Sequence, residues 1–122
     1  MVRDYIQAAR LRTLPLASAC VLTGGALAGA TGNVGFSRFI PLFIGCLLTV
    51  VLLQVLANFA NDLGDFENGA DRAEGSERSD RSVASGRIAA GQMKQAVWIT
   101  AGLAFVTGVA TVLLAVGDAW IT

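Results

Sequence analysis

Three long apolar segments separated by polar stretches dominate the pattern of hydrophobic and polar positions along this chain. No charged residue occurs in residues 13–37, 39–61 or 95–117. Each segment is longer than the roughly 20 residues that a helix needs to cross the hydrocarbon core of a bilayer. Helices of soluble proteins carry a polar face, which these segments lack. The pattern therefore predicts an all-α membrane protein with three transmembrane helices.

The predicted spans form a single transmembrane domain that covers residues 1–122. We place them at about residues 14–30, 39–60 and 96–116. Pro15 falls in the first turn of the first span, where a proline costs no backbone hydrogen bond. Residues 61–95 form a long polar connection, and connections of this length are usually functional or disordered. We expect this connection to be a loop at the membrane surface.

Composition agrees with a membrane protein and narrows the possible chemistry. The chain is 54% hydrophobic with a mean hydropathy of +0.61, which is too apolar for an ordinary soluble domain. It contains no histidine, so histidine catalysis and histidine metal ligands are excluded within it. Cys20 and Cys46 fall inside apolar segments and are interpreted as buried small hydrophobic residues. The net charge is zero, and no nucleic-acid partner is predicted.

The distribution of lysine and arginine predicts the orientation in the membrane. With three spans, the N-terminus and the polar connection lie on the same side, and Arg38 lies on the other. That first side carries the other eight basic residues: Arg3, Arg10, Arg12, Arg72, Arg78, Arg81, Arg87 and Lys94. Basic residues are enriched on the cytoplasmic side of membrane proteins. We therefore expect a multi-pass protein of the cell (inner) membrane whose N-terminus and acidic loop are cytoplasmic.

Three aspartates follow the second apolar segment, namely Asp62, Asp65 and Asp71. Gln54 and Asn58 precede Asp62 at helical spacing, so a polar stripe ends in these acids. Carboxylates near a bilayer are costly and indicate a functional site. Asp62 and Asp65 are three residues apart, about 5–6 Å on a helix, and they repel unless a cation lies between them. Oxygen ligands of this kind suit Mg²⁺ together with a substrate phosphate.

Basic residues of the polar connection complement these acids. Arginine binds phosphate oxygens in bidentate fashion, so arginines close to a metal-binding carboxylate group are typical of a phosphate site. The candidate residues are Arg72, Arg78, Arg81 and Lys94. The alternative interpretation is a solvated loop whose arginines only set the membrane orientation. The pattern therefore favours a phosphate-rich headgroup with a tail in lipid, and the lipid bilayer itself is a partner.

The acidic stretch resembles the first aspartate-rich motif, N-D-x-x-D-x-x-x-D, of the UbiA superfamily of intramembrane prenyltransferases. The matching residues are Asn61-Asp62-Leu-Gly-Asp65 followed by Asp71. Asp71 comes two residues later than the last aspartate of the general motif. This longer spacing resembles that of the branch that prenylates 1,4-dihydroxy-2-naphthoate in menaquinone synthesis. Residues 8–17 and 81–88 are similar to the opening and the post-motif loop of that branch. Ser82 departs from the pattern, because many relatives have proline there.

The resemblance implies a fold and an activity. Members have about nine spans and a second aspartate motif, so this chain resembles the N-terminal part of such a bundle. We expect it to be a fragment, inactive without the missing C-terminal helices. The implied reaction transfers a polyprenyl group from an allylic polyprenyl diphosphate to an aromatic acid acceptor, here 1,4-dihydroxy-2-naphthoate with decarboxylation. Implied roles are catalysis by Asp62 and Asp65, Mg²⁺ binding by these two and Asp71, and diphosphate binding by Asn58, Asn61, Arg72, Arg78, Arg81 and Lys94.

Two alternatives stay open at this point, and a third fails on its motif. Another member of the superfamily would take a different acceptor, such as 4-hydroxybenzoate. A CDP-alcohol phosphotransferase needs the pattern D-x-x-D-G, which fails because Phe66 follows Asp65. A transporter or channel subunit would use the acids as an ion site but leaves the arginine-rich connection unexplained.

The predicted orientation can be measured by labelling. Cysteines introduced at Ser37 and Ser76 in a cysteine-free background should react with an impermeant reagent from opposite sides of the membrane, because one span separates them. Labelling of both positions from the same side would contradict the three-span topology.

Overall fold

All the residues that the structure describes lie in helices or short connections between them. The computed structural model describes residues 2–32, 35–67 and 89–121, without the side chains of residues 65–67 and 118–121. The elements are α1 (Val2–Ala9), the 3-10 helix η1 (Leu11–Thr13), α2 (Leu14–Thr31), α3 (Phe36–Glu67) and α5 (Ala90–Ile121). Three helical stretches are long and apolar enough to cross a membrane: Val2–Thr31, Phe36–Gly64 and Ala90–Gly117. The predicted fold class, all-α with three membrane-spanning helices, is confirmed.

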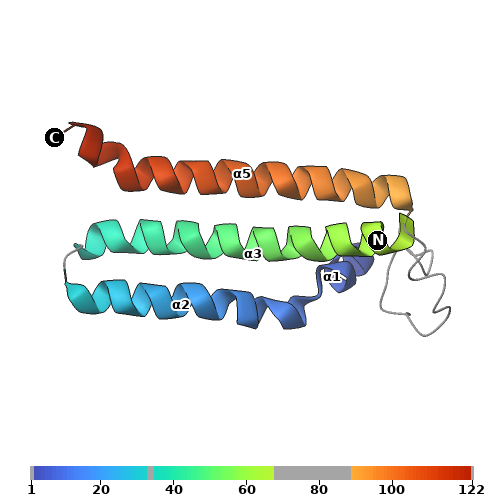
Figure 1. Cartoon of the computed structure of the whole chain (residues 1–122), viewed down its shortest axis with the longest axis horizontal. Coiled ribbons are helices and arrows are strands. Elements are labelled where there is room, and N and C mark those ends of the chain that lie inside the picture. Colours follow the sequence, from blue (N-terminus) through green and yellow to red (C-terminus); the bar gives the residue numbers. More distant parts are fainter. Residues whose placement is uncertain (1, 33–34, 68–88, 122) are drawn as a thin grey trace.

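The three long helices lie side by side with α3 in the middle (Figure 1). Each runs antiparallel to its neighbour, and α3 packs against both α2 and α5. The short helix α1 does not continue the line of α2 but packs against α3. The N-terminus, the end of α3 and the start of α5 therefore lie at the same end of the molecule.

Helix limits follow from local sequence. Pro15 occupies the first turn of α2, as predicted. Gly32 ends α2 in the left-handed conformation, with φ of 68°, and its amide donates to the carbonyl of Gly29 at 3.2 Å. A residue without a Cβ adopts this conformation at little cost, which makes glycine the usual end of a helix. Pro41 lies inside α3, one turn after its start.

Two of the helices extend beyond the apolar segments. The helix α3 continues past Ala60 through Asp62 and Asp65 to Glu67, and α5 begins at Ala90, ahead of Lys94. Both extensions fall within residues 61–95, the predicted loop, although the polar stripe predicts that Asp62 and Asp65 lie on a helix end. Where the helices enter and leave the bilayer stays a prediction.

Small residues allow α3 to approach both neighbours. A Cβ added at Gly25 of α2 would overlap the ring of Phe43, and one added at Gly45 of α3 would overlap the side chain of Thr111 in α5. Helices in membranes associate through such close packing, because lipid tails offer no hydrophobic driving force for association. Glycine at these positions therefore sets the spacing of the helices.

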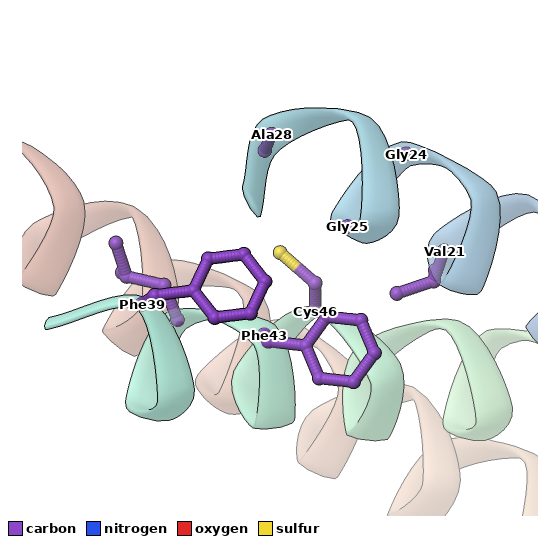
Figure 2. A pocket seen from close by; sticks show the side chains of 8 residues that line it. Val21, Gly24, Gly25, Ala28, Phe39, Phe43 and Cys46 are labelled. Atoms are coloured by element: carbon purple, nitrogen blue, oxygen red, sulfur yellow. The ribbon is translucent and has the colours of Figure 1, made fainter. Parts of the chain in front are cut away.

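An apolar hollow of about 340 Å³ lies between α2 and α3 (Figure 2). The stacked rings of Phe39 and Phe43, 5.7 Å apart, line it on the side of α3. Figure 2 shows the sulfur of Cys46 pointing from α3 toward the small residues of α2. Cys20 and Cys46 are both exposed, so the expectation that they are buried is wrong. A single layer of three helices leaves much of each helix surface uncovered.

The α3–α5 contact gives a test of this packing. Gly45→Ala should lower the stability of the protein by about 1–3 kcal/mol, because the new methyl group would overlap Oγ1, Cγ2 and Cβ of Thr111. Gly102→Ala is the matched control, since nothing lies within 4 Å of its added Cβ. The control should be neutral or more stable by up to about 1 kcal/mol, owing to the higher helix propensity of alanine. Thermal unfolding in detergent measures both, and equal effects would contradict the proposed close approach.

Candidate functional site

A break in the chain between α1 and α2 begins the site. The helix α1 ends at Ala9, and Arg10 adopts the left-handed conformation with φ of 53°. This conformation costs a residue other than glycine about 1–2 kcal/mol, so other contacts must hold it. The backbone amide and the hydroxyl of Thr13 both donate to the carbonyl of Arg10, at 2.9 and 2.8 Å. These bonds form the short helix η1 and turn the chain from α1 into α2.

The side chain of Asn58 joins this break to α3. Its Nδ2 donates to the carbonyl of Ala9 at 2.7 Å and to the hydroxyl of Thr13 at 3.0 Å, and its Oδ1 lies 3.5 Å from Nε2 of Gln54. The last carbonyls of any helix lack a partner within the helix, and Ala9 ends α1. Asn58 is only 4% exposed, so water does not replace these contacts. Both of its described donor bonds go to the protein. Its role in binding diphosphate stays a prediction.

Apolar side chains from three helices meet beside these hydrogen bonds. The buried cluster contains Ala8 and Ala9 of α1, Phe59 and Leu63 of α3, and Met93 of α5. The ring of Tyr5 adds an edge-to-face contact with Phe59, with centroids 6.3 Å apart. This cluster is the only hydrophobic core among the described side chains. It brings the ends of α1, α3 and α5 together in the region of the acidic motif.

Asp62 lies one helical turn after Asn58 and is almost fully buried, with 1% of its surface exposed. Asp65 follows three positions later on α3, while Asn61 is exposed. Lys94 is exposed on α5, next to the buried Met93. Asp71, Arg72, Arg78 and Arg81 lie outside the described residues. The structure thus places Asn58, Asn61, Asp62 and the position of Asp65 on one helix end and Lys94 on α5.

The donor set at this helix end suits a divalent cation that prefers oxygen. A buried carboxylate at the end of an apolar helix is costly unless it is paired, protonated or bound to a cation. A second carboxylate at the i, i+3 position adds a ligand of the same kind. Among the described residues, no group of three acidic or cysteine side chains lies close enough to hold a metal. A third ligand would have to come from elsewhere, and Asp71 is the predicted one.

Comparison with known proteins identifies the class. The chain belongs to the UbiA prenyltransferase family, whose model matches residues 17–121, and this confirms the resemblance inferred from the aspartate motif. It is 39% identical over 107 residues to the 1,4-dihydroxy-2-naphthoate octaprenyltransferase of Haemophilus influenzae, and the aligned residues cover 88% of this chain and 34% of that protein. It is 37% identical over 111 residues to the Escherichia coli protein of the same name, and these residues cover 91% of this chain and 34% of the relative. The chain therefore spans about a third of the length of these relatives. No solved structure matches it.

Three residues of the site were not anticipated from the sequence. Ala9 offers only a backbone carbonyl, and Arg10 gave no local sign of a left-handed conformation. Thr13 was treated as part of the helix entry and not as a hydrogen-bonding residue. The sequence signal for the break was Pro15, because a proline cannot donate the backbone hydrogen bond that would continue a preceding helix.

Met93 provides a test of the three-helix junction. Met93→Ala should destabilise the protein by about 2–5 kcal/mol, because the fully buried side chain fills the space between α1, α3 and α5. The exposed neighbour Gln92 gives the control, and Gln92→Ala should change stability by less than about 0.5 kcal/mol. Equal melting temperatures for the two variants would contradict the role of Met93 in joining the helices.

Proposed function

We propose that the full-length protein transfers a polyprenyl group from an allylic polyprenyl diphosphate to an aromatic acceptor. The observation that carries this proposal is the burial of Asp62 at the polar end of α3, in a chain that belongs to the UbiA prenyltransferase family. Both relatives are named 1,4-dihydroxy-2-naphthoate octaprenyltransferase, so dihydroxynaphthoate is the proposed acceptor and menaquinone synthesis the proposed pathway. Attack by the ring would then be accompanied by loss of its carboxyl group as carbon dioxide.

The proposed role of each candidate residue follows from its charge. Asp62 and Asp65 of α3, with Asp71, would hold Mg²⁺, which when bound neutralises the diphosphate and the charge that develops on the leaving pyrophosphate. Arg72, Arg78 and Arg81 of the polar connection and Lys94 of α5 would bind the diphosphate oxygens. Asn61, which is exposed beside Asp62, would contact the same group. The carboxylates and arginines would thus place charge of both signs around one diphosphate.

The surroundings of the site suit a substrate with an apolar tail. Residues 13–37, 39–61 and 95–117 contain no charged side chain, so a prenyl chain could lie along most of α2, α3 and α5 without meeting a charge. We place the acidic end of α3 and the N-terminus on the cytoplasmic face of the cell membrane, from which the charged headgroup and the aromatic acid would enter. The rest of the full-length protein would complete the cavity.

Neutralising the acids tests the proposal. In the full-length protein, Asp62→Asn and Asp65→Asn should each lower the rate of prenyl transfer by at least about 10²-fold, because each removes a carboxylate ligand of the Mg²⁺ that would stabilise the leaving pyrophosphate. Asp118→Asn, at the opposite end of α5, is the matched control and should leave the rate unchanged. The assay follows release of pyrophosphate and formation of prenylated product, with dihydroxynaphthoate and 4-hydroxybenzoate compared as acceptors over a range of Mg²⁺ concentrations. Wild-type turnover in both acidic variants would reject the assignment of these residues.

A further inference from the structure

The hydrogen bonds between the N-terminal break and α3 form one connected set, which we name the elbow lock. Its members are Ala9, Arg10, Thr13 and Asn58. The hydroxyl of Thr13 donates to the carbonyl of Arg10 and accepts from Nδ2 of Asn58, while the second donor bond of Nδ2 goes to Ala9. Each polar group in the set therefore depends on the next one.

The lock has no apolar substitute. A leucine at position 58 would match the asparagine in size but would leave the carbonyl of Ala9 without a donor in a site that water does not reach. Loss of the Thr13 hydroxyl would remove one of the two bonds that support the left-handed backbone of Arg10. We therefore expect that replacement of Asn58 or Thr13 releases α1 from α3, although every residue of the apolar cluster is unchanged.

The lock lies directly next to the acidic motif. Asp62 follows Asn58 by four positions, so the two residues lie on the same side of α3, one turn apart. Phe59 and Leu63, the residues after each of them, both belong to the cluster that contains Ala8 and Ala9 of α1. The helix α1 therefore covers the very turn of α3 that carries Asp62.

We infer that Asn58 and Thr13 are positioning residues that hold α1 as a wall of the diphosphate site. This inference rests on the proposed function and assigns Asn58 a role other than direct contact with diphosphate. Both described donor bonds of its amide are already made to Ala9 and Thr13. Docking of α1 fixes the surroundings of Asp62, and a small misplacement of a catalytic group lowers the rate steeply.

Distance measurements combined with kinetics test the inference in the full-length protein. Spin labels are attached to cysteines at the exposed positions Gln7 of α1 and Ala60 of α3, after replacement of Cys20, Cys46 and any other cysteine by alanine. The parent protein should give a narrow distance distribution. Thr13→Val and Asn58→Leu should both broaden it and should lower kcat for prenyl transfer by about 10- to 100-fold. Thr13→Ser retains the hydroxyl and should restore both readouts.

Thr107→Val is the matched control, because Thr107 donates a comparable hydroxyl bond, to Leu103, at an exposed site on α5. It should change neither the distance nor the rate. A narrow distribution in Thr13→Val would overturn the lock, and a broad one with unchanged kcat would overturn its positioning role. A raised KM for prenyl diphosphate in Asn58→Leu alone, with the distance unchanged, would show that Asn58 contacts the substrate instead.

Failure of the proposed function gives a different result. A full-length parent protein that transfers no prenyl group to any acceptor would reject that function and the positioning role that depends on it. The distance distributions of the variants would still decide whether Thr13 and Asn58 dock α1.

Discussion

The amide of Asn58 is the interaction on which the polar end of this molecule depends. A chain that leaves one helix and enters another exposes backbone carbonyls, and within or beside a bilayer these groups need protein partners because water is scarce. The break at Arg10 is of this kind, and the carbonyl of Ala9 finds its donor on α3. Without that donor, α1 could avoid the cost by continuing straight into α2. The amide therefore decides that α1 folds back onto α3, and the cluster of apolar residues around Phe59 and Met93 follows from that fold.

The rest of the structure supplies a rigid frame for this end. The helix α3 is a single element from Phe36 to Glu67, and it contacts α2 and α5 along its length. At the far end, the guanidinium of Arg38 on α3 donates to the carbonyl of Ala115 on α5. Sites on continuous helices hold their geometry better than sites on loops. The placement of Asp62 is thus set by α3 itself, and the surroundings of Asp62 are set by the elements that α3 binds.

The sequence predicted those features of the fold that depend on local pattern. Long segments without charged residues predicted the three helices, and the spacing of Asn58, Asp62 and Asp65 predicted that the acids lie at a helix end. The same pattern could not predict the bonds of Asn58 to Ala9 and Thr13, since these residues lie 49 and 45 positions away along the chain. Exposure of Cys46 was missed for a related reason, because an apolar segment does not reveal which of its faces meets another helix. Tertiary contacts, and not propensity, decided these outcomes.

Exposed apolar side chains on the outer helices explain why a few polar contacts carry so much of the specificity. Leu16 of α2 and Trp98 and Phe105 of α5 are each more than 70% exposed. In water this surface would drive the helices into a tight bundle, but in lipid it costs little, because lipid tails are as apolar as leucine. Burial of apolar area therefore does not select one arrangement of α1, α2, α3 and α5 over another. Close contacts at Gly25 and Gly45 select the spacing, and the directed bonds of Asn58 select the register of α1 on α3. An interhelical hydrogen bond in a membrane contributes only about 0.6–2 kcal/mol. That amount is decisive here because the competing arrangements of the helices otherwise differ little in free energy.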